Sequence, residues 1–303
     1  GTMVRNVVWN NPLGYMVKGD DHRVYNNVAF NNSATGAKIL NSAEHENANK
    51  RTISRNNLMQ DWSGDRRGNQ FTHAVPGIVD HNWLPASYNG NVFEVLRDPE
   101  NFDFRPKNNL LIDQGIEIPA EVFHNDELTR LGIPQTGAEN PDFTIDFNQG
   151  DAPDIGAYEA NDLNYWIPGR QLDKATVPIP PNNTTTAQLD CDLMWLPAYN
   201  TISNKVYFGT TSGNLALVST QENNIHILNN LDPYLTYYWR IDCLVGNDWI
   251  QGEEWQFIPG GAPYRDCGDR TSFEQTFDTP LGSEDYNSAP WIVDPAGENI
   301  EVH

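Results

Sequence analysis

Cysteine, basic residues and long apolar runs are all scarce in this 303-residue chain. Its three cysteines, Cys191, Cys243 and Cys267, are too few for a disulfide scaffold. Only 19 lysines and arginines stand against 41 acidic residues. The net charge of −22 argues against a nucleic-acid binder, which needs clustered cations to neutralise phosphates. No apolar run approaches the roughly 18 residues of a membrane span, and no signal peptide is recognisable.

The charge and the asparagine content are unevenly distributed. Residues 1–110 carry 12 basic and 11 acidic residues, whereas residues 111–303 carry 7 and 30. Asparagine occurs 36 times, and 19 of these lie in residues 1–110. A near-neutral region followed by a very acidic one predicts two different roles, or one functional region followed by solubilising modules.

An internal repeat opens the chain. Residues 5–11 match residues 26–32 at an offset of 21, residues 14–18 match 36–40 at an offset of 22, and residues 55–61 form a looser third copy. Each copy holds short β-rich runs without helical periodicity, which predicts one coil of a β-solenoid. Asparagine would occupy the corners, where it tolerates left-handed backbone angles, and could hydrogen-bond to its neighbour on the next coil. Asparagine-rich loops between antiparallel strands are the alternative.

These coils resemble the right-handed parallel β-helix proteins of the pectate-lyase-like group. Downstream, residues 103–106 (Asp-Phe-Arg-Pro), 111–115 (Leu-Ile-Asp-Gln-Gly) and 152–159 (Ala-Pro-Asp-Ile-Gly-Ala-Tyr-Glu) are similar to the closing segment of many secreted bacterial β-helix proteins. The family contains lyases, glycoside hydrolases, epimerases, adhesins and phage spikes. Because such helices usually have more coils and a polar cap, we expect upstream coils of the same gene product, or another chain, to cover the first coil.

The whole chain is expected to be all-β. Residues 1–168 would form the C-terminal coils and closing segment of the right-handed parallel β-helix, followed by a Pro-rich linker at 169–181. Residues 182–259 hold short strand-like runs between turn signals, which predict an immunoglobulin-like β-sandwich, and they resemble the fibronectin type III-like modules of secreted bacterial enzymes. Residues 260–303 would be a linker, a tail or the start of a further β-domain.

Within the predicted sandwich, Trp195 fits the buried core tryptophan and Tyr237 fits a tyrosine corner. Cys191 and Cys243 would lie at opposite ends of roughly parallel strands. A disulfide between them would exceed the Cα–Cα limit of roughly 7 Å. We therefore expect two free, partly buried thiols.

Candidate catalytic side chains come from the near-neutral first region. The resemblance implies a long polysaccharide lying along the coils, and a lyase needs a base and a cation beside the uronate carboxylate. Stacked cations, including Lys38 at nearly the coil position of Lys18, would form one basic stripe; otherwise they are scattered surface charges. The catalytic candidates are Lys18, His22, Arg23, His45, Arg51 and Arg55, and the substrate-binding candidates are Trp62, Arg66 and Arg67.

Acidic residues offer two further possibilities. Asp20-Asp21 is weakly similar to the paired aspartates of polygalacturonase-like hydrolases, although turns favour aspartate in any case. Oxygen ligands near the closing segment could hold Ca²⁺, or could form a solvated acidic loop. These candidate ligands are Asp146, Asn148, Asp151 and Asp154. No other cofactor is expected.

By this resemblance, the chain is the C-terminal part of a secreted or cell-surface protein that degrades an anionic polysaccharide, as a lyase or a glycoside hydrolase. Fold alone does not give function. The alternative is therefore a non-catalytic stalk, adhesin or glycan-binding surface protein.

Overall fold

A computed structural model describes residues 1–18, 22–32, 37–40, 52–60, 62–63, 78–84, 91–118, 150–260, 291–293 and 299–301. Apart from the short helix α2 (Val92–Val95) and the 3₁₀ helix η1 (Pro99–Asn101), every regular element in these ranges is a strand. The predicted all-β class is confirmed. No helix in these ranges is both long enough and apolar enough to span a membrane.

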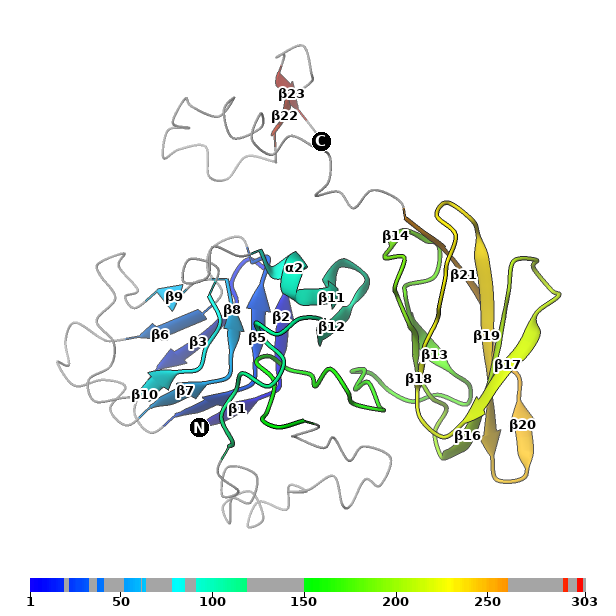
Figure 1. Ribbon diagram of the computed structural model, residues 1–303, viewed down its shortest axis with the longest axis horizontal. Helices are drawn as coiled ribbons and strands as arrows, with labels where there is room; N and C mark the ends of the chain where they lie inside the picture. The colour runs from blue at the N-terminus through cyan, green and yellow to red at the C-terminus, as the bar shows by residue number, and fades with distance from the viewer. Residues whose placement is uncertain are drawn as a thin grey trace. The chain divides into compact units, whose positions relative to one another are not determined.

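The first region forms three parallel sheets, which the chain visits in turn (Figure 1). One sheet contains β1 (Thr2–Val4), β4 (Arg23–Tyr25), β7 (Ile53–Arg55) and β10 (Ile78–Asp80). The next contains β2 (Val7–Trp9), β5 (Val28–Phe30) and β8 (Leu58–Met59). The third contains β3 (Tyr15–Lys18), β6 (Ala37–Leu40) and β9 (Trp62–Ser63). The pairing follows the sequence repeat, since Val7 pairs with Val28 and Tyr15 with Ala37.

A fourth turn of this pattern follows the three copies found in the sequence. Strand β10 pairs with β7 in parallel, and Trp83 forms a parallel bridge with Leu58. The sequence signal is a polar residue, an asparagine and an apolar residue at 81–83, which repeats the order at 56–58. It was missed because the segments between copies differ in length.

An asparagine ladder connects the strands where the chain passes from the first sheet to the second. The Nδ2 groups of Asn6, Asn27 and Asn57 donate to Oδ1 of Asn27, Asn57 and Asn82 at 2.9, 2.8 and 2.8 Å. The same three Oδ1 atoms also accept the backbone N–H groups of Asn6, Asn27 and Asn57. The ladder therefore pairs the corner amides, which would otherwise be costly to bury.

The residue before each rung has a left-handed backbone. The φ angles are 54° at Arg5, 50° at Asn26, 57° at Asn56 and 50° at His81. Asparagine tolerates this conformation better than most residues because its short side chain can hydrogen-bond locally. The prediction of asparagine at the corners is confirmed for Asn26 and Asn56. Arg5 and His81 occupy the equivalent positions in the first and last described repeats.

Residues 176–259 form a β-sandwich. One sheet has the order β13 (Thr176–Ile179), β15 (Leu193–Leu196), β18 (Ile225–His226). The other has the order β14 (Thr184–Ala187), β21 (Glu254–Pro259), β19 (Tyr237–Val245), β16 (Thr201–Gly209), β17 (Ala216–Gln221), with β20 (Asp248–Ile250) beside β19. As predicted, Trp195 is fully buried and the Tyr237 hydroxyl accepts the Asp232 N–H at 2.9 Å.

The segment predicted as a linker at 169–181 contains strand β13, so that prediction is wrong in its second half. Proline made this strand look like a spacer, because Pro178 and Pro180 interrupt a short apolar run. Strand β13 lies at the edge of its sheet, and an edge strand tolerates a residue that has no N–H to donate.

The sheet that contains β15 is buried on both faces. Leu193 and Trp195 pack in the core of the sandwich. Met194 and Leu196 point the other way and belong to a cluster that also holds Leu96, Phe104 and Tyr165 from the first region. The unbroken apolar run at 193–196 thus reflects two buried faces. Residues 1–261 form one compact unit, and a second unit, 262–303, contains the antiparallel pair β22 (Trp291–Val293) and β23 (Asn299–Glu301).

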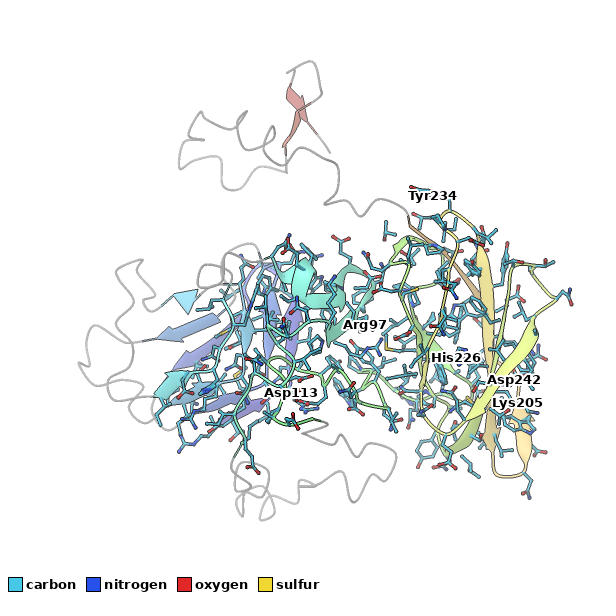
Figure 2. The ribbon with its side chains drawn as sticks, in the orientation of Figure 1. Arg97, Asp113, Lys205, His226, Tyr234 and Asp242 are labelled. Carbon is cyan, nitrogen blue, oxygen red and sulfur yellow. The ribbon has the colours of Figure 1, made fainter. Side chains whose placement is uncertain are left out.

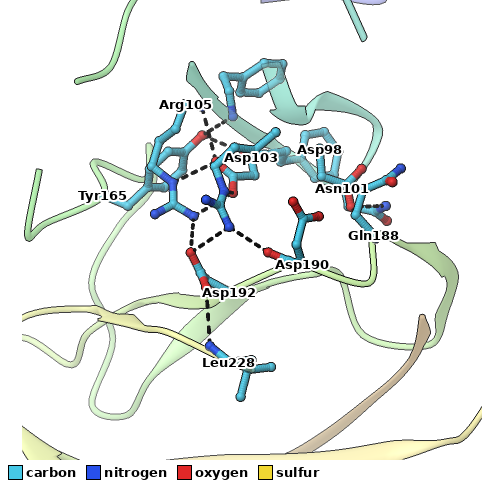
Figure 3. Close-up of polar contacts among 12 residues, drawn as sticks. Asp98, Asn101, Asp103, Arg105, Tyr165, Gln188, Asp190, Asp192 and Leu228 are labelled. Atoms are coloured by element: carbon cyan, nitrogen blue, oxygen red, sulfur yellow. Dashed lines mark hydrogen bonds and ion pairs between the residues drawn. The ribbon is translucent and has the colours of Figure 1, made fainter. Parts of the chain in front are cut away.

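Four charged side chains form an arginine–aspartate clasp at this junction (Arg97, Asp103, Arg105 and Asp192; Figure 3). They come from β11 (Leu96–Asp98), from β12 (Asp103–Pro106) and from the residue before β15. Arg105 Nη2 donates to Asp103 Oδ2 at 2.6 Å and to Asp192 Oδ2 at 2.8 Å. Arg97 Nη2 lies 3.1 Å from the same Asp192 oxygen. The clasp therefore joins the first region to the sandwich through charge-assisted bonds.

Three of the four side chains of the clasp are almost closed to water, whereas that of Arg97 is 27% exposed. The Arg105 side chain is 5% exposed, and Asp103 and Asp192 are each 3% exposed. Burial alone would lower the pKa of Arg105, but the two carboxylates outweigh it and raise the pKa. Every partner in such a site must remain, because removing one leaves an uncompensated buried charge.

The ladder is expected to stabilise the coils strongly at its buried rungs. Asn57→Ala removes the acceptor of the Asn27 N–H and the donors to the Val24 carbonyl and Asn82. We expect a loss of about 2–4 kcal/mol in the free energy of unfolding, since several buried groups lose partners. Asn6→Ala, at the exposed end, is the matched control and should cost less than about 1 kcal/mol. Equal urea midpoints for the two variants would contradict this account.

The clasp is expected to couple the two halves of residues 1–261 during unfolding. Arg105→Ala leaves Asp103 and Asp192 buried beside each other, and we expect a destabilisation of about 3–5 kcal/mol. Differential scanning calorimetry should show one unfolding transition for the parent chain and two for this variant. Lys174→Ala, which removes an exposed ion pair with Glu253, should leave the transition in place. An unsplit, unshifted transition for Arg105→Ala would refute the coupling.

Candidate functional site

The outer face of the first parallel sheet carries a charged flank, defined as Arg23, Arg55, Asp80 and His81. Arg23 on β4, Arg55 on β7 and Asp80 on β10 lie on one face, because alternate residues of a strand point to the same side. Val24 and Ser54, on the opposite face, are fully buried, and so is Tyr25, which lies on the same face directly opposite Arg55. The register places Asp80 directly opposite Arg55.

The centre of the charged flank is a contact among three side chains. Arg55 donates two hydrogen bonds to Asp80, from Nε to Oδ1 at 2.6 Å and from Nη2 to Oδ2 at 3.0 Å. His81 Nδ1 lies 3.2 Å from the same Oδ1, and its side chain is 43% exposed. Burial alone would raise the pKa of Asp80, but hydrogen bonds from Arg55 and His81 outweigh it and lower the pKa. Asp80 is therefore ionised at neutral pH.

The contact with Asp80 orients the His81 imidazole. A carboxylate that holds Nδ1–H of an imidazole leaves the other ring nitrogen able to accept a proton. His81 lies at the corner that follows β10 and has a left-handed backbone, with φ of 50°. Neither Asp80 nor His81 was identified from the sequence. The signal for them was the order Asp-His-Asn at 80–82, which repeats Arg-Asn-Asn at 55–57.

The predicted basic residues do not all gather on this flank. His22 lies directly before β4, is half-buried, and its backbone N–H donates to Thr52 Oγ1. Lys18 lies on β3 in the third sheet, where its register partner is Leu40, while Lys38 pairs with Met16. Lys18 and Lys38 are therefore diagonal neighbours on the third sheet, not on the sheet that carries Arg23 and Arg55. Arg23 and Arg55 do share one face, as diagonal neighbours.

Several of the predicted site residues, or their side chains, lie outside the described residues. Trp62 lies in β9 with Ala37 as its register partner, and its side chain is outside the described residues. The remaining substrate-binding, catalytic and metal candidates outside the described residues are His45, Arg51, Arg66, Arg67, Asp146 and Asn148, together with Asp20 and Asp21.

The two placed calcium candidates lie in the closing segment. Asp154 is 3% exposed, and its two oxygens accept the backbone N–H groups of Asp113 and Ala160 at 2.8 and 2.7 Å. Burial raises the pKa of Asp154 against the effect of these hydrogen bonds. Asp151 is exposed, and its N–H donates to Oδ1 of Asp113, which Figure 2 labels. Within the described residues no group of three or more His, Cys, Asp or Glu side chains is arranged to hold a metal ion.

The two cysteines of the sandwich are free and buried, as predicted, and more fully than expected. Burial raises the pKa of the Cys191 thiol, with a further contribution from Asp98 and Asp192. Burial also raises the pKa of Cys243. Since the thiolate is the reactive form, neither residue is suited to nucleophilic or redox chemistry.

Comparison with known proteins adds little to this geometry. No protein-family model matches the chain, and no curated protein matches it. Among solved structures, the solution structure of the 6th fibronectin type III domain from human fibronectin type III domain containing protein 3 is similar. It shares 18% sequence identity over 33% of this chain and 94% of that chain, with a TM-score of 0.24. The β-sandwich assignment accordingly depends on the strand order and core described above.

The buried thiols give a direct test of the sandwich core. In the native chain, iodoacetamide at neutral pH should leave Cys191 and Cys243 unmodified, because they are shielded and protonated. After denaturation both should be alkylated. Peptide mass spectrometry before and after denaturation reads out each site separately. Native alkylation of either residue at the denatured rate would contradict the packing described here.

Proposed function

We propose that residues 1–168 are coils of a right-handed parallel β-helix, and that they bind and cleave an anionic polysaccharide outside the cell. The sandwich would be a fibronectin type III-like accessory module. Three observations support the coils: the sequence repeat, the three parallel sheets visited in turn, and the asparagine ladder between them.

The observation that carries the proposal is the charged flank. Neighbouring strands in a sheet lie about 4.8 Å apart, and Arg23, Arg55 and His81 form a diagonal across β4, β7 and the end of β10. An extended polyanion lying across β4, β7 and β10 would meet these groups in succession. Guanidinium groups suit such a ligand, since they bind carboxylate and sulfate with paired hydrogen bonds.

Of the two reactions considered, elimination fits this flank better than hydrolysis. Hydrolysis needs two carboxylates across the scissile bond. Among the described residues, the flank offers one, Asp80, and Arg55 already holds it. Elimination needs a base and a cation, for which the flank provides His81 and the adjacent Arg55.

The proposed step is a β-elimination on a uronate. His81 Nε2 would take the proton from the carbon next to the carboxylate, while Arg55, which contacts the same Asp80 as His81, neutralises the negative charge that develops on that carboxylate. The electron pair forms a carbon–carbon double bond, and the glycosidic C–O bond breaks at the adjacent carbon. The leaving oxygen takes a proton from water or from the protonated histidine.

A second candidate function is a non-catalytic stalk. The arginine–aspartate clasp and the sheet buried on both faces favour it, because they would hold the coils and the sandwich in a fixed relation. A rigid connection suits a surface protein that only displays a binding site. The test below separates the two.

The proposal is tested with the full chain and a panel of uronate and sulfated polysaccharides. Binding is measured by isothermal titration calorimetry, and cleavage by the absorbance of the unsaturated product. We expect at least one glycan to bind, with Arg23→Ala weakening binding about tenfold through loss of a charge-assisted contact. His81→Asn should abolish cleavage and retain binding. Asparagine suits this corner, because Asn26 and Asn56 occupy the equivalent positions.

Lys107→Ala is the matched control, since it removes an exposed cation at the end of β12. It should leave both binding and cleavage unchanged. If Arg23→Ala and Lys107→Ala bind alike, or if no anionic glycan binds, the proposed flank is wrong. Binding that depends on Arg23 without any cleavage would select the non-catalytic alternative.

A further inference from the structure

A pocket of about 770 Å³ lies at one end of the sandwich, apart from the charged flank. It is formed where residues 170–173 pass the turn before β16 and the end of β19. A second pocket, of about 710 Å³, adjoins it, because Gln171 lines both. Both volumes fall within the range of ligand sites, roughly 300–1,000 Å³.

The first pocket combines an apolar surface with polar side chains. Leu172, Val245 and Ile250 contribute aliphatic surface. Arg170 and Asp173 also line the pocket. Among the described residues, the side chains of Arg170, Gln171 and Asp173 make no hydrogen bond or ion pair. A guanidinium, an amide and a carboxylate together supply both donors and acceptors.

Tyr199 is the aromatic surface of this pocket. Its side chain is 63% exposed, although its backbone N–H is fixed to the Leu172 carbonyl at 2.8 Å. Two other aromatic rings on the sandwich surface, Trp249 and Tyr207, are covered by cations. Lys205 Nζ lies 4.0 Å from the Trp249 ring centre, and Arg240 lies 4.4 Å from that of Tyr207. The Tyr199 ring has no such cation or aromatic partner among the described residues.

These features match the chemistry of a sugar ring. A pyranose has an apolar face of C–H groups, which packs on an aromatic ring, and a polar edge of hydroxyls. The hydroxyls need donors and acceptors side by side, as Arg170, Gln171 and Asp173 provide. Two adjoining pockets fit a ligand with more than one ring.

The charges at this end favour an uncharged ligand. Asp173 lines the first pocket and Glu222 the second, while Arg170 is the one cation in either lining among the described residues. A uronate or sulfated sugar would meet two carboxylates here. We propose that this paired pocket binds a neutral oligosaccharide, with Tyr199 stacked on one ring. The inference is independent of the charged flank, which would take an anionic glycan.

The test uses the full chain and neutral hexasaccharides built from glucose, xylose or mannose, with isothermal titration calorimetry. We expect at least one to bind. Tyr199→Ala should weaken that binding about tenfold or more, because the stacking surface is lost. Tyr199→Trp keeps an aromatic ring and should bind about as well as the parent chain. A merely structural role of Tyr199 would not predict this difference between the Ala and Trp variants. Asp173→Asn should weaken binding by removing a charged acceptor, and it provides a second variant if Tyr199→Ala fails to fold.

Tyr234→Ala is the matched control. Tyr234 is 73% exposed and precedes β19, whereas the pocket lies at the far end of that strand; Figure 2 shows Tyr234 apart from Lys205 and Asp242. This variant should bind as the parent chain does. Failure of all three neutral sugars to bind, or equal affinities of Tyr199→Ala and Tyr234→Ala, would overturn the inference.

The neutral and anionic sites are distinguishable in the same experiment. Arg23→Ala should leave neutral-sugar binding unchanged. If neutral sugars bind the parent chain and the Arg23→Ala variant but not the Tyr199→Ala variant, this inference is supported even if no anionic glycan binds. Anionic binding that depends on Arg23, with no neutral binding, supports the proposed function and overturns this inference.

Discussion

The three parallel sheets of the first region depend on the side-chain amides that connect one sequence repeat to the next. Strands of two to four residues make few backbone hydrogen bonds, so the corners between sheets decide whether the chain can stack. Asn27 and Asn57 are buried, and each binds the coil before it and the coil after it. A buried amide with all its partners stabilises, whereas one without them is costly. The ladder therefore fixes the register of the described repeats that Asn6, Asn27, Asn57 and Asn82 join.

The same ladder positions the charged flank. Arg55 is two residues before the rung at Asn57, and His81 directly precedes the rung at Asn82. Because the rungs are aligned, Arg55 lies opposite Asp80, and the His81 ring reaches the same carboxylate. The sandwich is joined to these coils by different means, a sheet with two buried faces and a clasp of four charged side chains.

The sequence predicts the repeating parts of this structure better than the contacts that connect the first region to the sandwich. The first two coils were readable because their offset is short and constant, and Tyr237 was readable because its corner contact is local. The clasp was not, because Arg105 and Asp192 are 87 residues apart and only the fold brings them together. Asp80 and His81 were missed for a related reason, since the segment between coils varies in length. The unbroken run at 193–196 was a usable signal of a second buried face.

Hydrogen exchange with mass spectrometry, on the full chain with and without an anionic glycan, tests the central claim most directly. The account predicts slower exchange in peptides that cover β4, β7 and β10, with His81 at their edge, and no change in β3 or β6. Protection confined to the third sheet or to the sandwich would contradict it. That result would place the ligand away from the charged flank.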